Sequence, residues 1–309
     1  FQNLKMAREV PSTEFSVLLS SLTDTKCWTM INPILKFEIS GLNGGTLINV
    51  YEYKEDSYLF YLILKYHKFE KLMLIGNSNR EDGEFEGRAM KAILPLIAEK
   101  LQEETVFETV LPSAANRELS KFVRDEQKCH PYTLMDAMTY TYIVEDEDQK
   151  ILLSKEVELS PEFEARQLEP YHAKQMMSVL LHYQSGDEDQ AAIRLAEFPS
   201  VGIFEKSSNK LVAFEYNDGL GSIAHQYVYP EYRGKKLGKA VEILICKKNI
   251  EELGLRPMKC VAILRPKARA ITEKAGYWKK RLDSFGNPAL TWWTLHSKTE
   301  KEKIKIFDN

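Results

Sequence analysis

The chain has 309 residues, of which 44% are apolar and 28% are charged. That length is large for one hydrophobic core and suits two domains of about 150 residues each. The formal net charge is −3, whereas general nucleic-acid binders usually carry a strongly basic face. The composition therefore excludes that class, and we expect no nucleic-acid partner.

Neither a membrane segment nor a metal site is indicated. The longest apolar runs, at residues 58–64 and 241–246, are far shorter than the ~20 residues of a membrane span. The four cysteines lack the paired spacing of a zinc site or a disulfide framework. We expect reduced thiols and a cytoplasmic protein. A mitochondrial location stays open because the sequence starts at Phe1, and a transit segment could precede it. The oligomeric state is not indicated.

The first half of the chain predicts two helices, near residues 13–22 and 28–35, followed by a glycine-rich break at 41–45. Runs rich in Tyr, Ile, Leu and Val then predict strands, and apolar residues spaced by three and four predict helices. In chain order these are strands 46–52, 57–64 and 71–76, helix 83–101, strand 106–111, helix 115–125 and strand 132–144. The acidic residues 145–148 are interpreted as a solvated linker or hairpin tip.

The second half repeats this order. Its predicted elements are helices 170–183 and 187–196, strands 201–205, 211–216 and 222–229, helix 237–253, strand 258–264, helix 266–274 and strands 277–282 and 289–295. Three strands, a helix, a strand, a helix and a strand thus occur in both halves. We predict a tandem α/β (α+β) protein in which each copy has a mixed central sheet flanked by helices, divided into residues 1–150 and 151–309.

The most distinctive segment joins strand 222–229 to helix 237–253. It reads Tyr-Pro-Glu-Tyr-Arg-Gly-Lys-Lys-Leu-Gly over residues 229–238. A helix that opens directly after a strand has unpaired N–H groups at its start, and its dipole adds about half a positive charge there. Arg233, Lys235, Lys236 and Lys239 add four full charges. The segment therefore predicts an anion site suited to a pyrophosphate.

Residues 233–238 resemble the acyl-CoA-binding signature Q/R-x-x-G-x-G/A of the GCN5-related N-acetyltransferase (GNAT) superfamily. Arg233, Gly234 and Gly238 match this signature, whereas Lys236 stands at its first glycine; we expect Lys236 to adopt ordinary right-handed helical angles. Residues 273–277, Glu-Lys-Ala-Gly-Tyr, resemble the closing Glu-Lys-x-Gly-Phe of the superfamily. Residues 195–233 look closer still to its glycine N-acyltransferase-like branch.

The resemblance implies that the second half binds acetyl-CoA or another acyl-CoA as cosubstrate. The positions that it assigns to the cofactor are Val228, Tyr229, Arg233, Gly234, Lys235, Lys236, Leu237, Gly238, Lys239 and Arg265. The first half has acidic residues, Glu81, Asp82 and Glu84, where its own phosphate loop would lie. Because these would repel a pyrophosphate, we predict that the first copy is degenerate.

Acyl transfer to an amine also needs a group that takes the amine proton. The resemblance places the usual base, a Glu, at Ser222, whose hydroxyl cannot accept a proton unaided at neutral pH. The other candidates are Glu215, Asp218 and His225. Strand alternation predicts that His225 lies on the face opposite Ser222. The tyrosine that serves as acid in many GNAT enzymes corresponds to Thr272.

These features predict an N-acyltransferase that moves an acetyl or larger acyl group from CoA directly to the amine of a small acceptor, such as glycine or another amino acid. The departures at Ser222, Thr272 and Arg265 keep an alternative open, a CoA-binding regulatory module with weak or no catalysis. A protein N-acetyltransferase is a third interpretation, supported only by the acidic runs at 145–148 and 186–189.

Overall fold

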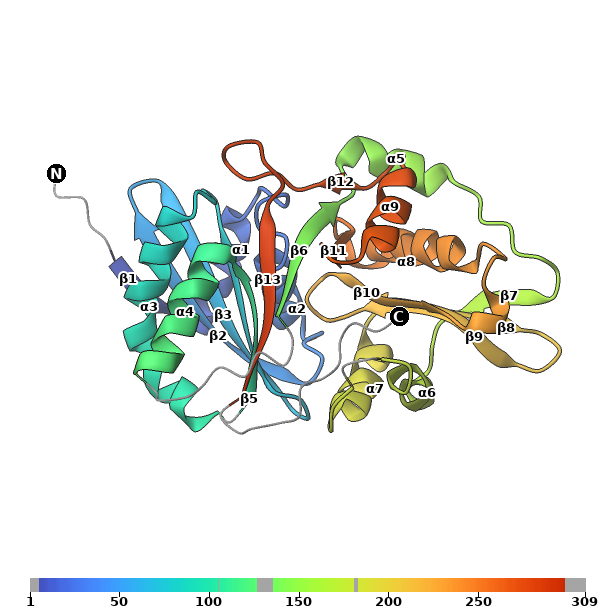
Figure 1. Ribbon diagram of the computed structural model, residues 1–309, viewed down its shortest axis with the longest axis horizontal. Coiled ribbons are helices and arrows are strands. Elements are labelled where there is room, and N and C mark those ends of the chain that lie inside the picture. Colours follow the sequence, from blue (N-terminus) through green and yellow to red (C-terminus); the bar gives the residue numbers. More distant parts are fainter. Residues whose placement is uncertain (1–5, 105, 127–135, 181–182, 298–309) are drawn as a thin grey trace.

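The computed structural model of the protein describes residues 6–104, 106–126, 136–180 and 183–297. Figure 1 shows the two halves of the chain side by side, with the first half in blue to green and the second half in light green to red. The mixed α/β class predicted from the sequence is confirmed, and so is the repeated order of elements.

The elements of the first half are β1 (Met6–Val10), η1 (Ser12–Glu14), α1 (Phe15–Ser21), α2 (Ile31–Ser40), β2 (Thr46–Glu55), β3 (Tyr58–His67), β4 (Leu72–Ser78), α3 (Glu84–Glu103), β5 (Val106–Pro112), α4 (Ser113–Asp125) and β6 (Asp136–Ile143). Those of the second half are α5 (Asp146–Ser154), β7 (Phe163–Arg166), η2 (Pro170–His172), α6 (Ala173–Met177), α7 (Asp187–Glu197), β8 (Ser200–Glu205), β9 (Lys210–Asn217), β10 (Ile223–Val228), η3 (Pro230–Tyr232), α8 (Leu237–Leu253), β11 (Met258–Ala262), α9 (Pro266–Lys274), β12 (Lys279–Lys280) and β13 (Leu290–Ser297).

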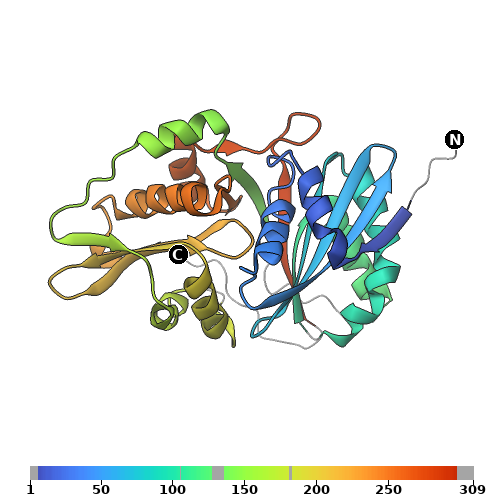
Figure 2. The ribbon, with the colours of Figure 1, turned by 180° about the vertical axis from the view of Figure 1, so that it is seen from behind.

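The two halves exchange strands. Among the described residues, one nine-stranded sheet has the order β1-β2-β3-β4-β5-β13-β6-β11, with β12 also paired to β6, and a second, four-stranded sheet has the order β10-β9-β8-β7. The last strand, β13, lies between β5 and β6 of the first half, and β6 in turn pairs with β11 of the second half. Figures 1 and 2 show β13 and β6 crossing between the halves. The predicted division after residue 150 falls within α5, and it stays a prediction.

Helices cover both faces of each sheet (Figures 1 and 2). Over the first half, α3 and α4 pack on one face, and α1 and α2 pack on the other. Over the four-stranded sheet, α8 packs on one face, and α6 and α7 pack on the other. These layers bury most of the apolar side chains that the sequence periodicity placed on strand and helix faces.

Two local predictions were wrong. The acidic residues expected in a linker open α5, because carboxylates in a first turn interact favourably with the helix dipole. Helix 170–183 is shorter, since only η2 and α6 are formed among its described residues. The strand predicted at 132–144 is confirmed over β6, whereas its residues 132–135 lie outside the described residues. The strands β1 and β7 were not predicted.

Helix α8 has the bounds predicted for it, but it is buried on more than one side. Its predicted apolar stripe includes Ala240, Ile243 and Cys246, and the structure buries Glu242 and Asn249 as well. A helix enclosed in this way is held by packing all round rather than by one amphipathic face. Its first turn is consequently fixed in place beside the end of β10.

Candidate active site

A bulge in β10 contains His225 and Gln226, and both residues line one cavity. On β10, Ala224 pairs with Tyr216 and Tyr227 pairs with Phe214 of β9. The two β10 residues between these pairs therefore oppose one β9 residue, Glu215. His225, at the bulge, has a φ of 59° in the left-handed region. The bulge interrupts the alternation of side chains, and both His225 and Ser222 line the cavity. The regular alternation on which the prediction of opposite faces rests is therefore interrupted at His225.

The cavity lies between the two sheets. Among the described residues, β10 is an edge of the four-stranded sheet, β11 is an edge of the nine-stranded sheet, and the two strands are not paired with each other. A cavity of about 460 Å³ occupies this region and has walls from both halves of the chain. Of the predicted site residues it brings together Glu215, Ser222, His225 and Arg265, with Thr272 beside them.

The predicted anion loop lies outside the cavity lining, at the start of α8. Its four cationic side chains, Arg233, Lys235, Lys236 and Lys239, are exposed. Gly234 and Lys236 have φ angles of 82° and 63°, so the expectation of right-handed angles for Lys236 was wrong. The signature glycine that Lys236 replaces is thus at a position whose backbone favours glycine. The open first turn of α8 keeps its N–H groups available to an anion.

Two of the four cations already have contacts. The Lys235 ammonium lies 5.0 Å from the ring centre of Phe163, within cation–π range. Arg233 donates a hydrogen bond from Nε to the carbonyl of Val228 at 3.1 Å. The N–H of Tyr229 donates to the carbonyl of Val212 at 3.0 Å. A cofactor that used these backbone groups would have to share or replace those partners.

Gln226 connects the loop to the cavity. Its side-chain amide donates to the carbonyl of Gly238 at 2.9 Å and to the carboxyl of Glu215 at 3.1 Å. A Cβ atom at position 238 would lie 3.4 Å from the Val228 side chain, an ordinary van der Waals distance, so the first turn of α8 lies directly against β10. The Gln226 side chain therefore bridges the predicted anion loop and the carboxyl of Glu215. Sequence reasoning missed Gln226 because its role depends on the bulge.

Glu215 is a buried carboxyl with an altered acidity. Burial, together with the nearby carboxylate of Glu242, raises the pKa of Glu215 to about 8, and Lys259 opposes this rise. Glu242 itself forms a salt bridge with Lys259 and accepts hydrogen bonds from Tyr277 at 2.6 Å and Trp278 at 3.1 Å. These contacts stabilise Glu242 as a carboxylate. Glu215 is consequently the carboxyl of the pair that can hold a proton near neutral pH.

Ser222 belongs to a tight turn with Asp218. The Ser222 hydroxyl donates to the Asp218 carboxylate at 2.5 Å, and the same carboxylate accepts from the N–H of Leu220 at 2.8 Å. Burial raises the pKa of Asp218 despite these hydrogen bonds. A carboxylate four residues earlier in the chain therefore lies beside the Ser222 hydroxyl. His225 stacks on Tyr216 with ring centres 5.4 Å apart.

Arg265, which precedes α9, and Thr272 within it line another side of the cavity. Arg265 is the exposed residue that precedes the first turn of this helix. Thr272 lies about two helical turns further along, is buried and lines the cavity. The structure therefore places a cation and a hydroxyl at the same wall of the cavity.

The corresponding loop in the first half is closed by its own carboxylates. The N–H of Gly83 donates to Glu86 at 2.7 Å, and the N–H of Phe85 donates to Asp82 at 2.8 Å. These side chains occupy the start of α3, where an external anion would bind. In addition, β4 and β5 are paired in parallel from Leu72 to Ile75, so the gap seen between β10 and β11 has no counterpart there. Both observations agree with a degenerate first copy.

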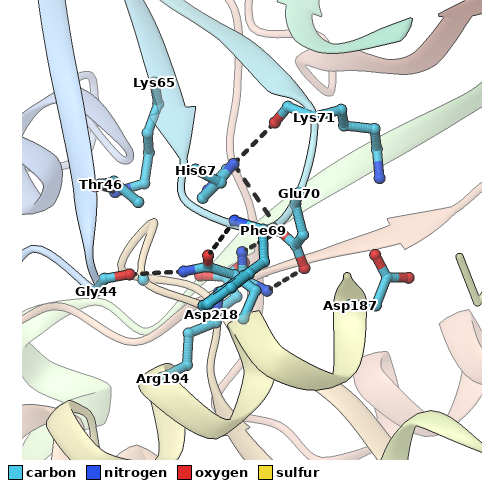
Figure 3. Close-up of polar contacts among 12 residues, drawn as sticks. Gly44, Thr46, Lys65, His67, Phe69, Glu70, Lys71, Asp187, Arg194 and Asp218 are labelled. Carbon is cyan, nitrogen blue, oxygen red and sulfur yellow. Dashed lines mark hydrogen bonds and ion pairs between the residues drawn. The ribbon is translucent and has the colours of Figure 1, made fainter. Parts of the chain in front are cut away.

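Sequence reasoning also missed the charged residues at the far end of the cavity. Figure 3 shows them where the β3–β4 hairpin meets α7. Arg194 donates two hydrogen bonds to Glu70, at 2.9 and 2.6 Å, and Lys71 lies 3.5 Å from Glu108. Asp187, at the start of α7, lines the same end. These residues come from three segments that are far apart in the sequence, near residues 70, 108 and 187–194, and no local pattern links them.

The hairpin and α7 are also joined through the backbone. The side chain of Gln190 donates to the carbonyl of Gly44 at 2.6 Å and accepts from the N–H of Phe69 at 3.4 Å (Figure 3). A Cβ atom at Gly186 would lie only 1.9 Å from the carbonyl oxygen of Phe69, so only glycine permits this approach. The first half therefore fixes the helix that forms one wall of the cavity.

No family model matches the chain, and no curated protein matches it. Solved structures do resemble it. A Drosophila protein from a structural genomics programme has a TM-score of 0.71 and 13% identity, over 96% of this chain and 100% of that one. A putative acetyltransferase from Pyrococcus horikoshii has a TM-score of 0.50 and 12% identity, over 99% and 93%. A tandem GNAT protein from the clavulanic acid pathway has a TM-score of 0.49 and 14% identity, over 97% and 100%.

At these identities the resemblance concerns the fold, which the chain shares over nearly its whole described length with the Drosophila and Pyrococcus proteins. Within the described part of the chain, no helix is long and apolar enough to cross a membrane. The same part of the chain contains no group of three or more His, Cys, Asp or Glu side chains that could hold a metal ion.

Proposed function

We propose that the protein is an acyl-CoA-dependent N-acyltransferase of the GNAT type. The observation that supports this best is Gln226, whose amide bonds both the first turn of α8 and the cavity carboxyl Glu215. It connects an anion site, suited to the pyrophosphate of CoA, to a cavity that contains a group able to take a proton. The cavity lies where β10 and β11 are unpaired, and this gap would accommodate the pantetheine arm.

In the proposed reaction the acceptor amine attacks the thioester carbonyl, a C–N bond forms, and the C–S bond breaks. The amine proton passes to ionised Glu215, and the CoA thiolate leaves and is protonated by solvent. Because the pKa of Glu215 is about 8, this carboxyl is an active base only as the pH approaches that value. Glycine and other amino acids are the acceptors that the sequence resemblance suggests.

The CoA site can be tested by reversing its charge. We expect Lys236→Glu with Lys239→Glu to weaken CoA binding by several kcal/mol, since each lost phosphate contact is worth about 1.5 to 3 kcal/mol. Acidic residues at a helix start interact favourably with the dipole, so this change should leave the helix intact. Calorimetry on the full chain, with the exposed Lys121→Glu on α4 as control, measures the effect. Equal CoA affinity in both variants would rule the loop out.

Catalysis is tested by following thiol release from acetyl-CoA with a panel of amines. We expect the rate to rise with pH up to about pH 8, and Glu215→Gln to lower it by about 10²- to 10⁴-fold while CoA still binds. A protein that binds CoA and releases no thiol with any amine would instead be the CoA-binding module. The pKa of Glu215, which burial and Glu242 raise to about 8, favours that second candidate, because a protonated carboxyl accepts no proton.

A further inference from the structure

The floor of the cavity is one face of the nine-stranded sheet. It has lining residues on each of five neighbouring strands, including Met73 of β4, Glu108 of β5, Trp293 of β13, Ala137 of β6 and Ala262 of β11. The strand registers place all five on the same face. Neighbouring strands are about 4.8 Å apart, so the floor extends roughly 19 Å. An extended glycine spans only about 3.5 Å and would fill a small part of this cavity.

The cavity continues through the gap between β10 and β11. On β11, Lys259 contacts Glu242 of α8, whereas Ala262 lies on the floor. Because strand residues alternate between faces, one side of the gap opens toward α8 and the other toward the floor. The anion loop leads into α8, so a CoA arm would enter from the α8 side. The other side, which we call the chamber, is enclosed by the five floor residues, α6 and α7, and is left for the acceptor.

The charged side chains of the chamber already have partners. The pairs are Glu70 with Arg194, Glu108 with Lys71, Asp187 with the N–H of Gln184, and Asp218 with the Ser222 hydroxyl. Figure 3 shows the first of these pairs where the β3–β4 hairpin meets α7. A carboxylate on the acceptor would have to take Lys71 or Arg194 from its present partner and leave that partner's charge buried. The chamber therefore disfavours a zwitterionic amino acid.

A further part of the chamber lining is apolar, namely Met73, Met177, Leu180, Leu220 and Trp293. Trp293 is paired in register with Ala137, and both line the floor. The short side chain of Ala137 leaves space beside the indole ring. An apolar group placed there is removed from water, which is worth about fourfold in affinity for each buried methylene.

We propose that the chamber binds the apolar body of the acceptor, a primary amine without a carboxylate and about the size of 2-phenylethylamine, and that Trp293 and Ala137 set the size of the body that fits. This inference rests on the proposed N-acyltransferase function. The amine nitrogen bonds to the acyl carbon in the β10–β11 gap, the C–S bond breaks, the amine proton passes to Glu215, and solvent protonates the thiolate. The apolar body meanwhile lies over the floor, so the exchanged strands β6 and β13 determine which acceptor is used.

Calorimetry on the full chain, saturated with CoA, tests the acceptor class with 2-phenylethylamine, propylamine, L-phenylalanine and glycine as probes. We expect 2-phenylethylamine to bind more tightly than propylamine by roughly tenfold or more, because its ring leaves water. It should exceed L-phenylalanine by a similar factor, because that probe adds only a carboxylate. Glycine or L-phenylalanine bound as tightly as 2-phenylethylamine overturns the inference, and so does equal affinity for the two amines.

Two substitutions in the floor should change the size of the body that fits in opposite directions. Ala137→Leu fills the space beside Trp293 and should weaken binding of 2-phenylethylamine by roughly tenfold or more, with propylamine affinity kept within about twofold. Trp293→Phe widens that space, so 2-(1-naphthyl)ethylamine should bind roughly fivefold more tightly or better. Ala165→Leu, at an exposed position of β7, is the matched control. Equal losses for both amines in Ala137→Leu, or no naphthyl gain in Trp293→Phe, would show that this floor does not set the size.

An apolar acyl chain is the other group that fits the chemistry of the chamber, and thiol release separates the two sources. We expect acetyl-CoA with 2-phenylethylamine to react faster than hexanoyl-CoA with glycine, by roughly tenfold or more. The reverse order would assign the apolar group to the acyl chain and overturn the inference.

The two proposals fail separately. CoA is also titrated into the same protein without any amine, and absent CoA binding contradicts the acyltransferase function together with the inference that rests on it. Tight CoA binding and thiol release with glycine, but no binding of 2-phenylethylamine, would leave the acyltransferase function standing and overturn only the apolar acceptor. Thiol release with 2-phenylethylamine, reduced in Ala137→Leu and not in Ala165→Leu, supports both.

Discussion

Lys236 shows how a single residue carries a local strain. Its φ of 63° is in the left-handed region, where a side chain costs roughly 1 to 2 kcal/mol relative to the right-handed region. Glycine would avoid that cost. It would also lose more backbone freedom on folding, which offsets about 0.5 to 1 kcal/mol of the gain.

We therefore expect Lys236→Gly to stabilise the protein by up to about 1 kcal/mol. Lys239→Gly, three residues later within α8, should destabilise it by about 0.5 to 1 kcal/mol, because glycine is a poor helix former. Denaturant unfolding of the two variants measures both effects. The opposite signs are the critical result, and a loss of stability in Lys236→Gly would show that the loop relaxes around lysine without strain.

Glu215 links the site to stability as well as to chemistry. Burial and Glu242 raise its pKa to about 8, so the folded protein retains a proton that the unfolded chain releases above about pH 4.3. The stability that comes from this proton is fully present below the unfolded pKa. It is lost as the pH rises through the folded value.

Glu215→Gln should accordingly flatten the fall in stability between about pH 5 and pH 9. Melting temperatures across that range measure the effect. Glu251→Gln, an exposed carboxyl on α8, is the control and should leave the slope unchanged. An unaltered slope in Glu215→Gln would mean that Glu215 is ionised in the folded protein at neutral pH.

At the scale of elements, the position of α7 depends on its contacts with the β3–β4 hairpin. The Glu70 and Arg194 side chains are only 9% and 11% exposed, so removing one of them leaves a buried charge without its partner. Such a loss typically costs about 3 to 5 kcal/mol, whereas replacing both partners with apolar residues is often close to neutral.

We expect Arg194→Met to lower the free energy of unfolding by about 3 to 5 kcal/mol, and Glu70→Met with Arg194→Met to recover most of it. Urea unfolding measures both. Lys26→Met, which removes an exposed ion pair with Glu145, should change stability by at most about 1 kcal/mol. A double variant as unstable as the single one would show that the hydrogen-bonded geometry, and not charge burial, holds α7.

At the scale of the whole molecule, the exchange of β6 and β13 makes the halves interdependent. The strand β13 pairs along its length with β5 and with β6, which come from the first half. Without it, both strands would expose unpaired N–H and C=O groups and apolar faces to water. The second half alone would likewise lack β6, the partner of β11.

We expect fragments 1–155 and 156–309 to be unfolded or aggregated separately, and the full chain to unfold in a single cooperative transition. Circular dichroism and gel filtration of the fragments, alone and mixed, test this. Recovery of folded protein only on mixing would support interdependence. An independently folded second fragment that binds CoA would contradict it, and would restore the division after residue 150 as a boundary of folding units.

The sequence alone determined the type and order of most elements and the position of the anion loop. Strand and helix periods, the break at Arg233 and Gly234, and the bounds of α8 are local properties, encoded in residues a few positions apart. The sequence did not predict the left-handed φ of Lys236 or the bulge at His225, because both follow from how β10 packs against α8 and β9.

Only the tertiary structure decided which strands pair and what the cavity contains. Nothing near β13 in the sequence indicates that it enters the sheet of the first half, because strand pairing depends on long-range contacts that share no local pattern. The same holds for Glu108 and Asp187, which are brought to one end of the cavity by the exchange of strands and the docking of α7. Local sequence encodes the elements and the loop, whereas their packing creates the composite site.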